Sequence, residues 1–103
     1  MNRLQISTKA RQYFKKIKDK ALQNKFKEAI ADIVLDPYTA GKPKKGDLAG
    51  IYCYDVYHQG TNYEIAYAIE EDEHGNFIII ILAGTRENFY KELSRYIRKN
   101  KPS

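Results

Sequence analysis

Cysteine and histidine are scarce in this sequence, which has one cysteine and two histidines among 103 residues. Cys53 alone cannot form an internal disulfide, so the chain is not a disulfide scaffold, and we expect it in a reducing cytoplasm. The two histidines, His58 and His74, cannot complete a two-cysteine, two-histidine zinc site with it. The sequence therefore suggests no metal ion, and it suggests no other cofactor.

Long apolar runs are also missing. No stretch approaches the roughly 20 apolar residues that a membrane span requires, and residues 1–5 do not form the apolar core of a signal peptide. Hydrophobic residues nevertheless make up 43% of the chain and aromatic residues 13%, which is enough to build a folded core. At this length we expect one domain, residues 1–103, in the cytoplasm and without a membrane partner.

Cations are absent from the middle of the chain. Residues 46–85 contain no lysine or arginine and seven acidic residues, whereas residues 1–45 carry a net charge of +8 and residues 86–103 a net charge of +4. The overall charge of +5 favours an anionic partner, but only for the two ends of the chain. The acidic run at 70–73 is typical of a hairpin tip or a solvated face.

Helical periodicity dominates the first third of the sequence. Residues 4–6 alternate as in a short edge strand, and Ser7 or Thr8 can then cap a helix through its hydroxyl. Two apolar stripes follow at helical spacing. They are Ala10, Tyr13, Phe14 and Ile17, and then Leu22, Phe26, Ala29, Ile30 and Ile33. A break near residues 18–20 predicts a helical hairpin, and Asp36 before Pro37 ends it.

Strand patterns follow a predicted loop over residues 38–50. Residues 51–57, 63–69 and 77–82 are rich in β-branched and aromatic side chains, with turn residues at 60–62 and 74–76, so they predict an antiparallel meander. Because residues 77–82 are apolar on both faces, we expect them to form the central strand. Apolar spacing after residue 85 predicts a C-terminal helix.

The fold class is therefore α+β. We expect an N-terminal helical hairpin, preceded by a short edge strand, packed on an antiparallel β-meander, with a C-terminal helix. The helices should cover one face of the sheet, which leaves the other face solvated or available as the working surface.

This order of elements resembles the RelE/ParE family of type II toxin–antitoxin toxins. The resemblance covers nearly the whole chain and rests on order and spacing together. The segments that carry it are Asp36-Pro37, Leu48-Ala49-Gly50, Tyr63-Glu64-Ile65-Ala66-Tyr67-Ala68-Ile69 and Gly84-Thr85-Arg86-Glu87-Asn88-Phe89-Tyr90.

The resemblance implies a toxin that is held inactive by an antitoxin. Most characterised members of the family cleave mRNA in the ribosomal A site, while the ParE branch poisons DNA gyrase. It thus implies a metal-independent, ribosome-dependent mRNA endoribonuclease that inhibits translation, with the ribosome, mRNA and an acidic, wrapping antitoxin as partners. Operator DNA would be contacted only through the antitoxin. A gyrase-binding toxin and a catalytically inactive regulatory relative are the alternatives.

The catalytic positions of the family are only partly matched. Nucleases of the RelE type carry lysines on the first meander strand and an arginine on the second, where this chain has Asp55, Tyr57 and Glu64. Arg86 matches the arginine at the end of the last strand, and Tyr90 stands near the C-terminal tyrosine. YoeB-type relatives use a Glu, His, Tyr and Arg set, which makes an acid at the site compatible with the chemistry.

Cleavage of RNA requires a base for the 2′-hydroxyl, an acid for the leaving oxygen and a cation for the developing charge. We assign catalysis to Arg86 as the cation, Glu64 as the base and Tyr90 as the residue that donates the proton or stacks on a base. Tyr57 with the nearby His58 is the alternative for this last role. A structural salt bridge between Glu64 and Arg86, or a Tyr90 that only covers the sheet edge, is the alternative. The candidate RNA-binding residues are Lys42, Lys44, Lys45, Lys91, Tyr57 and His58.

Some of these side chains also fit ordinary structural roles. His58 lies next to a turn, where a solvated hairpin residue is expected, and the three lysines at 42, 44 and 45 could belong to a solvated loop. Cys53 is expected to be a small buried hydrophobic residue and not a nucleophile.

Overall fold

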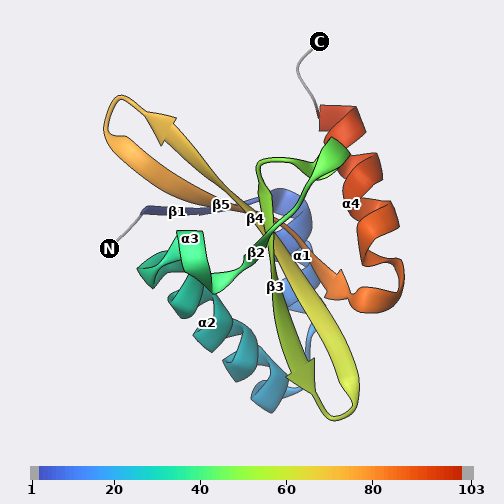
Figure 1. Cartoon of the computed structure of the whole chain (residues 1–103). Coiled ribbons are helices and arrows are strands. Elements are labelled where there is room, and N and C mark those ends of the chain that lie inside the picture. The colour runs from blue at the N-terminus through green and yellow to red at the C-terminus, as the bar shows by residue number, and fades with distance from the viewer. Residues whose placement is uncertain (1–2, 101–103) are drawn as a thin grey trace.

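A computed structural model describes residues 3–100 of the chain, so the ends of the predicted domain 1–103 lie outside the described residues. Its centre is a five-stranded sheet in the order β1-β5-β4-β3-β2 (Figure 1). The strands are β1 (Arg3–Ile6), β2 (Lys42–Pro43), β3 (Ile51–His58), β4 (Thr61–Asp72) and β5 (Gly75–Thr85). Strands β3, β4 and β5 form the predicted antiparallel meander, and β1 is the predicted edge strand, parallel to β5.

The expectation that residues 77–82 form the central strand was wrong in position. Strand β4 is at the centre of the five, and β5 lies between β4 and β1. A strand that is apolar on both faces needs cover on both faces, and any interior strand meets that condition. Its place in the sheet is set by the hairpin connection to β4 on one side and by the pairing with β1 on the other.

The turns of the meander are tighter than the sequence suggested. Gln59 and Gly60 have φ angles of 49° and 79°, as in a two-residue type I′ hairpin turn, so Thr61 and Asn62 already belong to β4. The second turn holds Glu73 and His74, and β5 begins at Gly75. The strands therefore extend beyond the predicted limits of 63–69 and 77–82.

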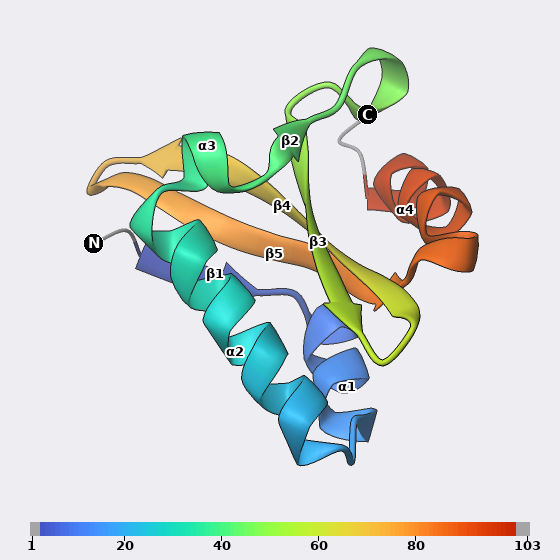
Figure 2. The ribbon, with the colours of Figure 1, turned by 60° about the horizontal axis from the view of Figure 1, so that its bottom comes forward.

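The helical hairpin consists of α1 (Thr8–Lys16) and α2 (Lys20–Leu35), which lie together on one side of the sheet (Figure 2). The Ser7 hydroxyl caps α1 by accepting a hydrogen bond from the Ala10 backbone N–H at 3.0 Å, as predicted. Apolar side chains of both helices pack onto the sheet in one core. Its buried members include Ala10, Leu22, Phe26, Ala29, Ile33, Val56, Ile65, Tyr67, Ile78 and Ile80.

The C-terminal helix α4 (Arg86–Asn100) covers the other face of the sheet. Its Phe89 and Leu93 are buried in a second core with Ile51, Cys53 and Ala66. The expectation that all helices share one face was therefore wrong. The two apolar faces of β5 give the reason, because a strand that buries both faces needs a layer on each side.

The predicted loop at 38–50 contains short regular elements. Pro37 is the first residue of α3 (Pro37–Ala40), β2 pairs with β3, and a 3₁₀ turn, η1, spans Gly46–Leu48. The hydroxyl of Tyr67 on β4 ties this segment to the core. It donates to the Pro37 carbonyl at 2.7 Å and accepts from the Gly41 N–H at 2.8 Å.

Within residues 3–100, no helix combines the length and the apolar character that crossing a membrane would take.

Candidate functional site beneath the C-terminal helix

Two carboxylates face α4 from neighbouring strands. Asp55 on β3 is the register partner of Glu64 on β4. Cys53 lies two residues before Asp55, and Ala66 lies two residues after Glu64, and both belong to the core beneath α4. Side chains two residues apart on a strand share a face, so Asp55 and Glu64 lie on the α4 side. The pairing brings together two acids that are far apart in the sequence.

Tyr90 of α4 covers the pair of carboxylates, Asp55 and Glu64. It belongs to the first turns of α4, and its hydroxyl donates a hydrogen bond of 2.7 Å to Oε1 of Glu64. The neighbouring Phe89 is buried in the core, which fixes this part of the helix against the sheet. As a result, only 2% of Glu64 is exposed, although Asp55 remains open to solvent.

The environment of Glu64 favours its protonated form. Burial is the largest cause and raises the pKa of the Glu64 carboxyl, and the neighbouring carboxylate of Asp55 raises it further. The Tyr90 hydrogen bond and the positive charge of Arg86 act in the opposite direction. Among residues 3–100, no hydrogen-bond donor reaches the buried Oε2 of Glu64, so burial of this oxygen is not offset by a partner. A carboxyl with these neighbours is suited to proton transfer.

A lysine and a cysteine complete the surroundings of Tyr90. The ammonium of Lys44 lies 4.8 Å from the centre of the Tyr90 ring. Burial, and then the hydrogen bond to Glu64, raises the pKa of the Tyr90 hydroxyl, which keeps it protonated as a donor. Burial raises the pKa of Cys53 to about 11, although the charge of Lys44 opposes this, so the thiol is neutral as expected.

The three residues assigned to catalysis lie at the same end of the sheet. Glu64 and Tyr90 are in direct contact. Arg86 is the first residue of α4, exposed, and close enough to Glu64 for its charge to lower the pKa of that carboxyl. The hydroxyl of Tyr90 and the guanidinium of Arg86 therefore lie near the buried carboxyl of Glu64.

The residues predicted to bind RNA are less well grouped. Lys44 lies over Tyr90, Lys42 and Lys45 are exposed on the same segment, and Lys91 is exposed on α4 directly after Tyr90. Tyr57 is exposed on β3, two residues beyond Asp55.

His58 lies on the opposite face of the sheet. It is only 7% exposed, and its Nε2 is 3.1 Å from Oδ2 of Asp19, the residue that caps α2. The prediction of a solvated hairpin residue was therefore wrong. The extra residue of β3 beyond Tyr57 turns its side chain toward the helical hairpin, where α2 begins.

Two residues of the site were not assigned to it from the sequence. Asp55 stood out only as a departure from the family pattern, and Cys53 was not placed at the site. The spacing of 53 and 55 on one strand and of 64 and 66 on the next was the available signal. Its use depends on the strand register, which the pattern of side chains does not give.

No group of three or more His, Cys, Asp or Glu side chains suited to a metal ion occurs within the part of the chain that the structure describes.

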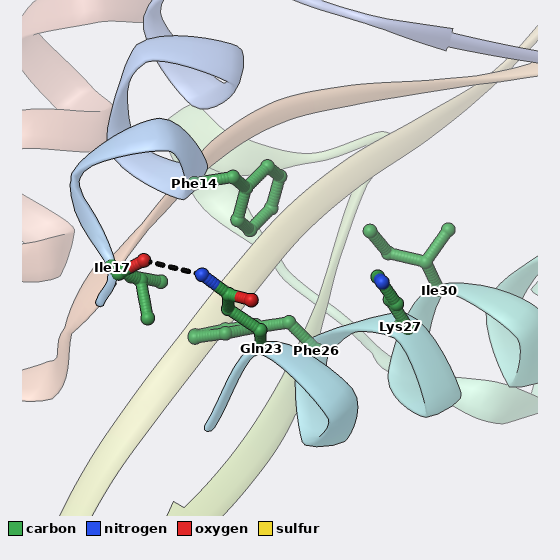
Figure 3. A pocket seen from close by; sticks show the side chains of 6 residues that line it. All are labelled: Phe14, Ile17, Gln23, Phe26, Lys27 and Ile30. Atoms are coloured by element: carbon green, nitrogen blue, oxygen red, sulfur yellow. Dashed lines mark hydrogen bonds between the residues drawn. The ribbon is translucent and has the colours of Figure 1, made fainter. Parts of the chain in front are cut away.

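An apolar pocket of about 230 Å³ opens on the other face, between α1 and α2 (Figure 3). Its walls are Phe14, Ile17, Gln23, Phe26, Lys27 and Ile30. The amide of Gln23 donates to the Ile17 carbonyl at 2.6 Å, which closes the end of the pocket where the two helices meet. The lysines at 15, 16, 18, 20 and 27 lie on the same hairpin. The surface is therefore an apolar pocket among basic side chains.

Residues 4–94 of the chain match the sequence model of the ParE-like toxins of type II bacterial toxin–antitoxin systems. The chain belongs to this family. It is thus a toxin of the type II class, and the resemblance to RelE/ParE toxins is confirmed.

Solved structures agree with this fold. A chain in the crystal structure of the toxin–antitoxin complex RelBE2 from Mycobacterium tuberculosis is 25% identical, with a TM-score of 0.62 over 82% of this chain and 98% of that chain. A mutant of the Escherichia coli toxin RelE in the free state is 14% identical, with a TM-score of 0.68 over 96% of this chain and 97% of that chain. A search of curated proteins found no significant match.

Proposed function

We propose that this toxin is a metal-independent endoribonuclease that cleaves mRNA on the ribosome and so inhibits translation in the cytoplasm. The observation that carries the proposal is the contact between Glu64 and Tyr90 beneath α4. It joins a carboxyl of raised pKa to a protonated phenol, close to a fixed positive charge.

Glu64 acts as the general base in this proposal. Its carboxylate accepts the proton of the 2′-hydroxyl, and the 2′-oxygen attacks the adjacent phosphorus while the bond from phosphorus to the 5′-oxygen breaks. A raised pKa makes the ionised carboxylate a stronger base than an exposed glutamate. Tyr90 donates its proton to the leaving 5′-oxygen, which leaves a 2′,3′-cyclic phosphate and a 5′-hydroxyl.

Access to Glu64 requires Tyr90 to move. In the free chain the Tyr90 hydroxyl occupies Oε1 of Glu64, the position that the substrate 2′-hydroxyl would take. Displacing the first turns of α4 would exchange one donor for the other and free the phenol for the leaving group. The closed arrangement keeps Glu64 covered until the substrate is in place.

Two cations supply the charge that strands β3 to β5 lack. Arg86 can hold two phosphate oxygens through its planar guanidinium. Lys44 approaches from the segment before β3, over the ring of Tyr90. Together they flank the Glu64 and Tyr90 pair and offset the negative charge that grows on the transferred phosphoryl group.

The test is primer extension on mRNA from cells that express the toxin, and on mRNA bound to purified ribosomes. Discrete cuts within codons are expected for the wild type and not for Glu64→Gln or Arg86→Ala. Lys99→Ala removes a cation from the far end of α4 and should cleave normally. Full cleavage by Glu64→Gln would refute the assignment of the base.

A second function is favoured by a different observation. The family model that matches is that of ParE-like toxins, and residues 46–85 carry no lysine or arginine. A non-nucleolytic toxin that binds DNA gyrase would need no cations on these strands. Intact mRNA together with DNA damage in the expressing cells would establish this alternative and exclude the first. Intact mRNA, undamaged DNA and no growth arrest would instead indicate a regulatory relative.

We also infer an acidic antitoxin as partner, which would mediate any contact with operator DNA. The RelBE2 structure is a toxin–antitoxin complex. In this chain the basic helical hairpin surrounds an apolar pocket, and Arg86 adds a charge at the far end of the sheet. An acidic chain with apolar side chains would match both features.

Co-purification with the product of a small adjacent gene is the experiment. Affinity that falls with rising salt is expected from the lysines, and Ile30→Lys in the pocket should weaken the complex even at low salt. A complex that resists both changes would contradict this placement.

A further inference from the structure

A polar groove of about 310 Å³ lies between α1, the end of β5 and the first turns of α4. Lys9, Gln12 and Lys16 line it from one stripe of α1, because residues three, four and seven apart share a helix face. Asn88 and Glu92 line it from α4, again four residues apart. The groove is thus built from three segments that are distant in the sequence, with polar side chains on two of its walls.

The β5 wall connects the groove to the candidate active site. Gly84 and Thr85 line the groove, and Gly84 is the register partner of Glu64 on β4. Arg86 follows directly in the chain. The groove therefore begins about one strand spacing, roughly 5 Å, from the backbone of the residue proposed as the base. A polymer bound at Glu64 would therefore place its neighbouring unit in the groove.

The two helical walls are close together. Burial raises the pKa of Tyr13 in α1, and the charge of Glu92 in α4 adds to this effect across the groove. The lysines and both amide side chains are exposed, so their donors and acceptors are available to a ligand.

We propose that this groove binds a nucleotide of single-stranded RNA next to the cleaved bond. This inference rests on the proposed endoribonuclease function and adds a site that positions its substrate. Lys9 and Lys16 contact the phosphates on either side of the nucleotide. Gln12 and Asn88 present paired donors and acceptors to the edge of the base, and Glu92 accepts a hydrogen bond from an amino group.

The chemistry of the walls favours RNA over an acidic protein segment. Gln12 and Asn88 each carry a donor and an acceptor, and a base edge can pair with both, whereas a carboxylate only accepts and leaves the two amide oxygens unpaired. Glu92 would repel an acidic peptide, whereas a base with an exocyclic amino group satisfies it. An acidic peptide is therefore the competing occupant that the test must separate.

The experiment measures the binding of a fluorescein-labelled eight-nucleotide RNA by anisotropy, with the full chain carrying Glu64→Gln to prevent cleavage. A double variant, Lys9→Ala with Lys16→Ala, should weaken binding about tenfold. The slope of log affinity against log salt concentration should fall by the amount that about two phosphate contacts contribute. The matched control, Lys18→Ala with Lys20→Ala, removes the same charge from the same hairpin outside the groove and should bind normally. Gln12→Ala with Asn88→Ala should change the preference among RNA sequences.

Equal loss in the groove variant and the control would refute the site and indicate only general charge attraction. Loss of binding to a poly-glutamate peptide with unchanged RNA binding would also refute it. Circular dichroism checks that each variant is folded.

The proposed endoribonuclease activity and the proposed groove can be tested separately, by measuring cleavage with groove variants that keep Glu64. Cleavage that persists while the groove variants bind RNA normally would refute the groove alone. Groove-dependent RNA binding without any cleavage would refute the endoribonuclease and support the groove as an RNA site.

Discussion

The hydroxyl of Tyr90 donates a hydrogen bond of 2.7 Å to the buried Oε1 of Glu64, and this contact fastens α4 to the central strand of the sheet. The same contact couples the position of the helix to the protonation of a carboxyl. A hydrogen bond to the ionised form stabilises that form, so the tyrosine opposes the effect of burial on Glu64. Movement of α4 and the acidity of Glu64 are therefore linked.

Replacing Tyr90 should shift the pH dependence of RNA cleavage. Tyr90→Phe removes the hydrogen bond that lowers the pKa of Glu64, so that pKa rises further. Because the proposed base must be ionised, the rising limb of the pH–rate profile should move to higher pH, and the maximal rate should fall because the proton donor is lost. Tyr38→Phe, an exposed tyrosine in α3, should leave the profile unchanged. A profile of Tyr90→Phe identical to that of the wild type would contradict the coupling.

Glu64 should make the folded chain less stable as pH rises above 4.5. Its pKa is raised in the folded state from an ordinary value of 4.5. The folded state therefore holds a proton that the unfolded state has already released, and the free energy of unfolding falls between 4.5 and the folded pKa. Below pH 4.5 both states hold the proton, so Glu64 does not lower the free energy of unfolding there.

Glu64→Gln tests this sign. Its carbonyl still accepts from Tyr90, and its amide can donate to Asp55, so the variant should unfold at higher temperature than the wild type at neutral pH. Below about pH 4 the difference should shrink or reverse. Thermal unfolding followed by circular dichroism at several pH values measures it. A variant that is less stable than the wild type at neutral pH would show that Glu64 is ionised and well paired in the fold.

Tyr67→Phe should destabilise the fold by about 1–3 kcal/mol. Its hydroxyl is fully buried and satisfies both the Pro37 carbonyl and the Gly41 N–H. The variant leaves both backbone groups without this partner in the core. Tyr54→Phe is the control, because its hydroxyl donates only to the exposed Asp32, and it should cost less than about 1 kcal/mol. Urea unfolding that ranks the two variants equally would count against the role given to the Tyr67 hydroxyl.

Cys53 should react slowly with alkylating reagents in the folded chain. Burial raises its pKa from 9.0 to about 11, which lowers the thiolate fraction at pH 8 about 100-fold. Lys44→Met removes a charge that opposes this shift and should slow the reaction further. Lys42→Met, on the same segment but exposed, should not. Native Cys53 that is modified as fast as the urea-unfolded chain would mean that the core beneath α4 opens freely.

The sequence was sufficient for the main helices and the strands of the meander, but not for the short elements of residues 37–48 or for the arrangement of the helices on the two faces. Helical spacing predicted the hairpin and its Ser7 cap, and β-branched runs predicted the three strands of the meander. The same runs placed residues 77–82 at the centre, which is wrong, because a two-sided apolar strand indicates burial and not position. The nearby turn predicted a solvated His58, which is also wrong, because β3 extends to His58 and its last residue faces the helical hairpin.

The candidate site divides in the same way. Glu64, Tyr90 and Arg86 were chosen one by one from the chemistry that each could perform and from the family resemblance. Their contacts depend on a register that pairs Asp55 with Glu64 and on α4 crossing the face that carries them. Neither is encoded in the local pattern, since a shift of one residue would turn either acid to the opposite face.

What the sequence determined by itself is local: the helical hairpin, the strands, the family, and a chain with no lysine or arginine over residues 46–85. Only the tertiary structure decided that these acidic strands meet Lys44 and Arg86 at one end, that α4 covers Glu64, and that a polar groove continues from Gly84. The physical reason is that local propensity depends on neighbours in the chain, whereas burial, pKa and the pairing of charges depend on which distant segments the packed sheet brings together.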